Sequence, residues 1–227
     1  MNPVKALESH GQAVWLDFFA RGFVAKGELK KLIDVDGVKG VTSNPAIFEK
    51  AIGSSDEYDA PIGKALKRGD RDVADLFEQL AIEDIQRAAD VLRPVYDRLH
   101  GSDGFVSLEV SPYLATDTKA TITEAERLWK AVGRKNLMIK VPATAEGLPA
   151  IEQLIGEGIN VNITLLFSQK VYLQVAEAYL AGLERYVAKA GDPTHVASVA
   201  SFFVSRIDTM VDKELDQKIA RANDPAE

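Results

Sequence analysis

The chain has 227 residues, of which 46% are hydrophobic and 27% charged, and its formal net charge at pH 7 is −7. This composition is typical of a globular protein with a sizeable core and argues against a disordered chain. The acidic balance argues against sequence-independent nucleic-acid binding, which needs clustered Lys and Arg. The chain has no Cys, which excludes disulfides, thiolate metal sites and cysteine nucleophiles. Its three histidines lie too far apart in sequence to suggest a metal site. We expect no metal and no cofactor.

Membrane attachment is not expected either. No apolar run approaches the roughly 18 residues of a membrane-spanning helix. The N-terminal segment lacks the basic start, apolar stretch and cleavage site of a signal peptide. We therefore expect a cytoplasmic protein, and the sequence leaves its oligomeric state open.

Short apolar runs alternate with longer segments of helical periodicity, which is typical of a parallel sheet built from βα units. The runs are Val14–Phe19, Val38–Asn44, Val106–Val110, Leu137–Val141, Ile159–Phe167 and Val196–Val204. The predicted helices are Val73–Arg98 with Asp72 as its cap, Thr123–Val132, Leu148–Gly156, Ser168–Ala190 and Ser205–Ala220.

These βα units predict a barrel that is two strands short. A closed (β/α)8 barrel has eight strands and typically ~250 residues. We expect residues 1–227 to form a single α/β-barrel domain with about six of the eight βα units. An open sheet would also fit, but we favour a chain that is the C-terminally incomplete part of a longer protein.

Lys140 lies inside the fourth apolar run, on the opposite parity from Leu137, Ile139 and Val141. An unpaired ammonium inside a strand is costly, and burial favours the neutral amine. A neutral amine is a nucleophile that can form a Schiff base. The structural alternative is a lysine that reaches solvent or pairs with a carboxylate.

Polar residues also lie in the carboxyl-terminal half of the other runs, or at their ends. They are Asp17, Thr42 and Asn44, Glu109, Asn160, Asn162 and Thr164, and Ser201. In a parallel α/β barrel these strand ends form the catalytic mouth, where inward-pointing polar residues bind substrate or react. The strands together therefore favour a functional site.

Each of these residues has a structural alternative when it is taken alone. Asp17 or Glu109 could be the partner that neutralises Lys140. Asn44, which precedes a proline, could simply cap the next helix. Ser201 could be a small core residue.

A series of segments resembles the transaldolases, specifically the longer bacterial type. They are WLDFFARG, GVTSNPAIFEKAI, LAIEDI, VSLEVSPYLATDT, NLMIKVPATAEGLPAI, GINVNITLLFS and SVASFFVSRID, in order and spacing. The most specific pieces are the T-S-N-P turn, the I-K-V-P-A-T strand and the N-I-T-L-L-F-S strand. The resemblance runs from about residue 12 to residue 215. It implies a barrel with class I aldolase chemistry, a lysine Schiff base and no metal.

The resemblance also implies a role for each candidate residue. Lys140 is then the Schiff-base lysine, Asp17 the acid/base residue, Glu109 the carboxylate that moves protons through a bound water, and Thr164 the residue that holds this water. The implied substrate-binding residues are Thr42, Asn44, Asn162, Ser201, Phe203 and Arg206, with Arg206 facing an anionic group.

The activity implied is transfer of a dihydroxyacetone unit from sedoheptulose 7-phosphate or fructose 6-phosphate to an aldose phosphate, in the pentose phosphate pathway. One alternative is a lyase similar to fructose-6-phosphate aldolase, which releases the unit instead. Another is a non-catalytic sugar-phosphate binder. The short aldolases fit less well, because they complete eight strands in a similar length and their lysine must fall earlier than Lys140.

Overall fold

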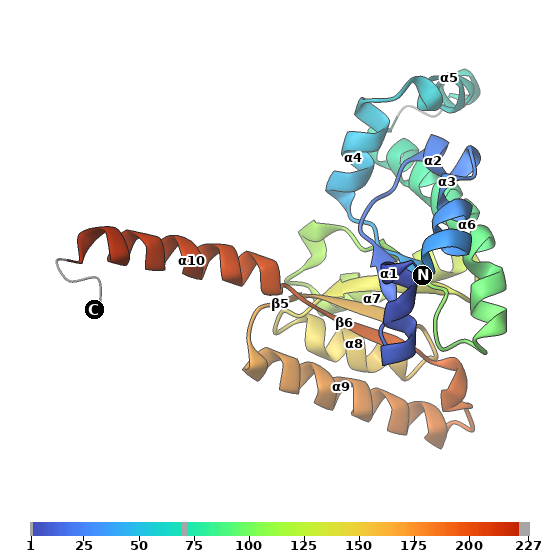
Figure 1. The fold of residues 1–227 in the computed structure, drawn as a ribbon. Coiled ribbons are helices and arrows are strands. Elements are labelled where there is room, and N and C mark those ends of the chain that lie inside the picture. The colour runs from blue at the N-terminus through green and yellow to red at the C-terminus, as the bar shows by residue number, and fades with distance from the viewer. Residues whose placement is uncertain (1, 70–71, 223–227) are drawn as a thin grey trace.

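The computed structural model describes residues 2–69 and 72–222 (Figure 1). Its strands form one sheet whose order in space is the order along the chain, and every neighbouring pair is parallel. The strands are β1 (Val14–Leu16), β2 (Val38–Val41), β3 (Val106–Glu109), β4 (Leu137–Pro142), β5 (Val161–Leu166) and β6 (Ser198–Phe202). Each lies within or overlaps one of the predicted runs. The prediction of about six of the eight units of a (β/α)8 barrel is confirmed, and the sheet is a curled partial barrel with β1 and β6 at its edges.

Helices separate the strands. They are α1 (Pro3–Ala6), α2 (Arg21–Ala25), α3 (Glu28–Lys31), α4 (Pro45–Gly53), α5 (Asp59–Arg68), α6 (Val73–Arg98), α7 (Thr118–Val132), α8 (Gly147–Ile155), α9 (Gln169–Ala188) and α10 (Val204–Arg221). Shorter helical segments are η1 (Leu7–His10), η2 (Leu32–Asp36), η3 (Asp56–Tyr58), η4 (Pro112–Leu114) and η5 (Pro193–His195).

Side-chain caps fix where several helices begin. Asp72 caps α6, which has the bounds that its periodicity predicts, by accepting bonds from the first backbone N–H groups. Helix α7 begins earlier than predicted because Asp117 accepts a bond from the Ala120 N–H at 2.9 Å. Asn44 caps α4 in the same way. These caps satisfy N–H groups that have no partner within the helix.

The main core lies between the outer face of the sheet and the helices. Leu137, Ile139 and Val141 of β4 are fully buried there, together with Ile85 and Leu92 of α6. Because successive side chains of a strand point to opposite faces, this burial directs the alternate residues of β4 to the inner face. A slip of one residue would expose the apolar set, so the core fixes the register.

A large aromatic ring sets the shape of the inner face near β1. Trp15 is paired with Gly40 of β2, and its indole Nε1 donates a hydrogen bond to Asp103 Oδ1 at 2.9 Å. A Cβ atom on residue 40 would lie 2.3 Å from the indole Cδ2. Only glycine therefore leaves room for the ring at this point.

Helix α10 extends away from the rest of the molecule (Figure 1) and buries none of its residues. Met210 and Ile219 are 67% and 69% exposed. Within the described residues no helix combines the length and the apolar character needed to cross a membrane.

Candidate active site

Glu109, Lys140 and Asn162 form a row across three neighbouring strands. Glu109 of β3 is paired with Lys140 of β4, and Lys140 is paired with Asn162 of β5. Paired residues of parallel strands point to the same face of the sheet, here the inner one. Lys140 is 7% exposed and Asn162 1%. A cation, an anion and an amide are thus held side by side in a buried setting.

The Lys140 ammonium has two oxygen partners. Its Nζ lies 3.5 Å from Glu109 Oε2 and donates a hydrogen bond to the Ser43 carbonyl oxygen at 3.3 Å. Burial raises the pKa of the Glu109 carboxyl, and the neighbouring Lys140 ammonium opposes this rise. A carboxyl beside an amine can give a proton to, or take one from, a group attached to that amine.

Asn162 belongs to a hydrogen-bonded chain of side chains. Ser201 Oγ of β6 donates to Asn162 Oδ1 at 2.7 Å, and Asn162 Nδ2 donates to Ser107 Oγ of β3 at 2.8 Å. Ser43 Oγ in turn donates to the Ser107 carbonyl oxygen at 2.7 Å. This chain fixes the orientation of the Asn162 amide and joins β3, β5 and β6 with the segment that follows β2.

Ser43 and Ser107 are parts of the site that the sequence analysis did not single out. Both are fully buried. The signal for Ser107 was its parity, which it shares with Glu109 on the third run. Ser43 lies in the T-S-N-P turn and contacts Lys140 through its backbone carbonyl. Every residue type has this group, so the sequence could not indicate the contact.

The residues that follow β2 serve different purposes. Thr42 lines a cavity of about 380 Å³ on the inner face of the partial barrel, together with Trp15, Asn162 and Ser201. Asn44 caps α4, and its Oδ1 accepts a hydrogen bond from the Ile47 N–H at 2.9 Å. The structural alternative for Asn44 is therefore present in the molecule.

Thr164 lies on the same face of β5 as Asn162 and is 1% exposed. It is paired with Pro142, at the end of the strand that carries Lys140. The next residue, Leu165, has a φ of 61°, and the β5–β6 register shifts in this stretch. Thr164 therefore lies on the carboxyl-terminal side of the row, and its role in holding a water stays a prediction.

Asp17, Phe203 and Arg206 lie at the two edges of the sheet rather than in the row. Asp17 directly follows β1 and is exposed. Phe203 follows β6, and its ring stacks on Phe167 with a centroid distance of 5.1 Å. The Arg206 guanidinium of α10 lies 4.5 Å from the Phe203 ring centroid. Among the described residues, the structure does not bring Asp17 and Arg206 into contact with Lys140.

The chain resembles known proteins over nearly its whole length. Residues 14–227 match the family model "Transaldolase/Fructose-6-phosphate aldolase". A transaldolase of Trichodesmium erythraeum is 48% identical over 223 residues, which cover 98% of this chain and 58% of the relative. A transaldolase of Thermobifida fusca is 50% identical over 216 residues, which cover 95% of this chain and 58% of the relative. The chain therefore spans about three fifths of the length of these relatives.

Proposed function

Since the chain belongs to the transaldolase/fructose-6-phosphate aldolase family, we propose that it carries the Schiff-base half of a transaldolase site. The observation that supports the proposal is the buried Lys140 amine, 3.5 Å from the Glu109 carboxylate. The activity is transfer of a dihydroxyacetone unit from sedoheptulose 7-phosphate or fructose 6-phosphate to an aldose phosphate. We assign this activity to the cytoplasm and the pentose phosphate pathway, with sugar phosphates as partners and neither nucleic acid nor a membrane.

The first half of the reaction forms the Schiff base. The Lys140 amine adds to the C2 ketone of the ketose phosphate and gives a carbinolamine. Glu109 delivers a proton to the carbinolamine oxygen, directly or through a water held by Thr164, and the oxygen leaves as water. The product is an iminium ion, which can accept the electron pair of a neighbouring bond.

The second half breaks and remakes a carbon–carbon bond. Asp17 takes the proton of the C4 hydroxyl, the C3–C4 bond breaks, and an aldose phosphate leaves. The electron pair of that bond moves into the iminium, so a three-carbon enamine stays on Lys140. It then attacks the aldehyde of an acceptor aldose phosphate, and hydrolysis of the new iminium releases the product and the free amine.

The remaining residues would hold the substrate. The Asn162 amide, oriented by Ser201 and Ser107, is suited to a sugar hydroxyl or the bound intermediate. We assign the Asn44 amide nitrogen and the Thr42 hydroxyl to sugar hydroxyls as well. Further substrate contacts are Ser201, Phe203 and Arg206, with the guanidinium of Arg206 as the phosphate contact.

Borohydride trapping tests the proposal. The protein is incubated with fructose 6-phosphate, reduced, digested and mapped by mass spectrometry. We expect an adduct of one reduced three-carbon unit on Lys140, no such adduct on the Lys140→Met variant, and an unchanged yield for Lys39→Met. Lys39 is a matched control because it is a strand lysine that pairs with a carboxylate, Glu8, at 2.8 Å.

The outcomes separate the candidate functions. No adduct on a folded sample would contradict the Schiff-base assignment and favour a non-catalytic sugar-phosphate binder. Release of free dihydroxyacetone without an aldose phosphate acceptor would indicate a lyase instead of a transferase.

A further inference from the structure

A second cavity lies at the end of the sheet opposite to the lysine site. It has a volume of about 450 Å³. Its lining includes one residue just before each of three strands. These are Lys135 before β4, Asn160 before β5 and His195 before β6. Lys140 lies further along β4, toward the carboxyl-terminal end. Neither the reaction proposed above nor its residues make use of this cavity.

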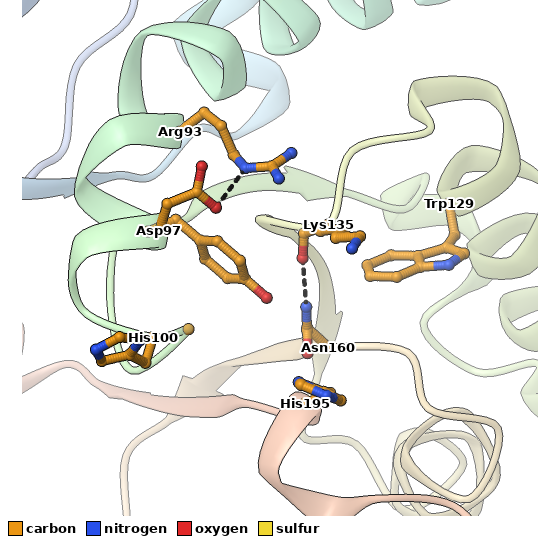
Figure 2. A pocket seen from close by; sticks show the side chains of 9 residues that line it. Arg93, Asp97, His100, Trp129, Lys135, Asn160 and His195 are labelled. Carbon is orange, nitrogen blue, oxygen red and sulfur yellow. Dashed lines mark hydrogen bonds and ion pairs between the residues drawn. The ribbon is translucent and has the colours of Figure 1, made fainter.

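Four groups that can carry positive charge line the cavity, together with one carboxylate, that of Asp97. Figure 2 shows the side chains of Arg93, His100, Lys135 and His195 arranged around its open centre. Arg93 Nε donates to Asp97 Oδ1 at 2.8 Å.

Within the described part of the chain, two of these four groups have an acidic partner, and two do not. His195 Nε2 lies 3.6 Å from Asp192 Oδ2. For Lys135 Nζ and the His100 ring, the structure of residues 2–69 and 72–222 shows no hydrogen-bond or ion-pair partner. The rim therefore keeps cationic capacity for an added anion.

A rigid floor positions this rim. Asn160 is 1% exposed, and its Nδ2 donates to the carbonyl oxygens of Lys135 and Leu137 at 3.1 and 3.0 Å. Its Oδ1 accepts a bond from the Ala197 N–H at 2.8 Å. One buried amide thus joins the starts of β4, β5 and β6, and it fixes the backbone from which Lys135 and the segment after His195 extend.

The walls of the cavity are aromatic. The Trp129 indole faces the cavity from α7 (Figure 2). Tyr96 lies in the wall with the Arg93 guanidinium 5.9 Å from its ring centroid, and it packs edge-on against Phe105 at 5.4 Å. An aromatic wall next to a cationic rim suits a ligand that carries both a flat ring and an anionic group.

We propose that this cavity binds a nucleoside monophosphate, with its phosphate on Lys135 and its base against Trp129. Lysine and arginine side chains form strong charge-assisted hydrogen bonds to phosphate oxygens. The volume lies within the range of about 300–1,000 Å³ that small-molecule sites occupy. The proposal does not depend on the catalytic assignment of Lys140.

Titration with AMP tests the proposal. Binding is measured by calorimetry and by the NMR signals of the histidine ring protons. We expect saturable binding that shifts the signals of His100 and His195 but leaves His10, on η1, unchanged. Lys135→Gln should weaken AMP binding at least tenfold. Lys130→Gln is the matched control because Lys130 lies on the outside of α7, paired with Glu126, and it should bind AMP as the wild type does.

Two related compounds test each part of the ligand. Adenosine lacks the phosphate and ribose 5-phosphate lacks the base, so both should bind this cavity at least tenfold more weakly than AMP. Ribose 5-phosphate bound at the lysine site would leave the His100 and His195 signals unchanged. The proposal is overturned if AMP shifts the signals of neither His100 nor His195, or if Lys135→Gln binds AMP like the wild type. It is also overturned if adenosine or ribose 5-phosphate shifts these signals with the same affinity as AMP.

Discussion

Lys140 and Glu109 face each other at paired positions of β4 and β3, with 3.5 Å between Nζ and Oε2. The two strands are paired from Val106 to Glu109. Because the ladder fixes both backbones, neither group can leave the other without a change of side-chain conformation. Each side chain is therefore a fixed part of the electrostatic environment of its partner.

This pairing predicts how Glu109 titrates. Burial raises the pKa of its carboxyl above the ordinary value of 4.5, and the Lys140 ammonium offsets the rise only in part. Lys140→Met removes the opposing cation, so the pKa of Glu109 should rise further. The ¹³C signal of the Glu109 side-chain carboxyl, followed against pH, measures both midpoints.

The control for this titration is Lys39→Met, because Lys39 pairs with Glu8 and has no contact with the row. In this variant Glu109 should titrate as in the wild type. A midpoint that falls in Lys140→Met would show that the lysine does not stabilise the charged carboxylate.

Ser107→Ala should destabilise the protein. The substitution removes the hydroxyl that accepts the hydrogen bond of Asn162 Nδ2 at 2.8 Å. A buried N–H group left without a partner costs about 1–3 kcal/mol. We expect the free energy of unfolding, measured by urea denaturation, to fall by that amount, and borohydride trapping on Lys140 to slow because the Asn162 amide loses its fixed orientation.

Ser198→Ala is the matched control for this substitution. Ser198 Oγ donates to the Val161 carbonyl oxygen at 2.9 Å, between the same strand β5 and its neighbour β6. Its loss leaves no buried side-chain donor unpaired, so the effect on unfolding should be smaller and trapping should not change. Equal losses in the two variants would mean that the Asn162–Ser107 bond has no special role.

The strands and the inner row were predictable because β-strands alternate with a period of two. A charged or amide residue inside an apolar run must point away from the core, and this places Lys140 and Asn162 on one face. The register between strands was not predictable. It decides that Glu109, and not Asp17, lies next to the lysine, and it depends on packing of the whole sheet.

Other features had no distinct signal in the sequence. Ser107 was not singled out because its role depends on a partner two strands away. Arg206 was expected to face an anionic group, while in this structure its guanidinium lies over the Phe203 ring. The role of Arg206 as a phosphate contact remains a prediction.

Breaking the buried ion pair between Arg21 of α2 and Asp84 of α6 should destabilise the protein. Arg21 Nε lies 2.7 Å from Asp84 Oδ1, and their side chains are 6% and 0% exposed. The Tyr58 hydroxyl donates to Asp84 Oδ2 at 2.8 Å. Asp84→Asn leaves the buried guanidinium with only the half-exposed Glu83 as an anionic partner, and breaking a buried ion pair by removing one partner typically costs about 3–5 kcal/mol. Urea denaturation should show a loss of this size.

Glu83→Gln provides the comparison. Glu83 Oε2 also contacts Arg21, at 3.3 Å, but its side chain is 50% exposed. Pairs with an exposed partner contribute about 0–1 kcal/mol because water screens them. If Asp84→Asn were no more destabilising than Glu83→Gln, the buried pair would not support the packing of α2 on α6.

The contact between Gly40 and Trp15 predicts a rescue by a second substitution. In Gly40→Ala the new Cβ would lie 2.3 Å from the indole Cδ2, so the ring must move, and overpacking of this kind costs about 1–3 kcal/mol. Trp15→Leu removes the ring and should lower stability by itself. In the double variant the methyl group has room, so the combined loss should be smaller than the sum of the two single losses.

A double-mutant cycle by urea denaturation measures this coupling. The control is Gly63→Ala, since a Cβ on this glycine of α5 would meet nothing within 4 Å. Alanine has the higher helix propensity, so this variant should be as stable as the wild type or up to about 1 kcal/mol more stable, and its effect should add to that of Trp15→Leu without coupling. Strict additivity of Gly40→Ala with Trp15→Leu would mean that the indole does not lie against residue 40, and the inner face beside β1 would then have a different shape.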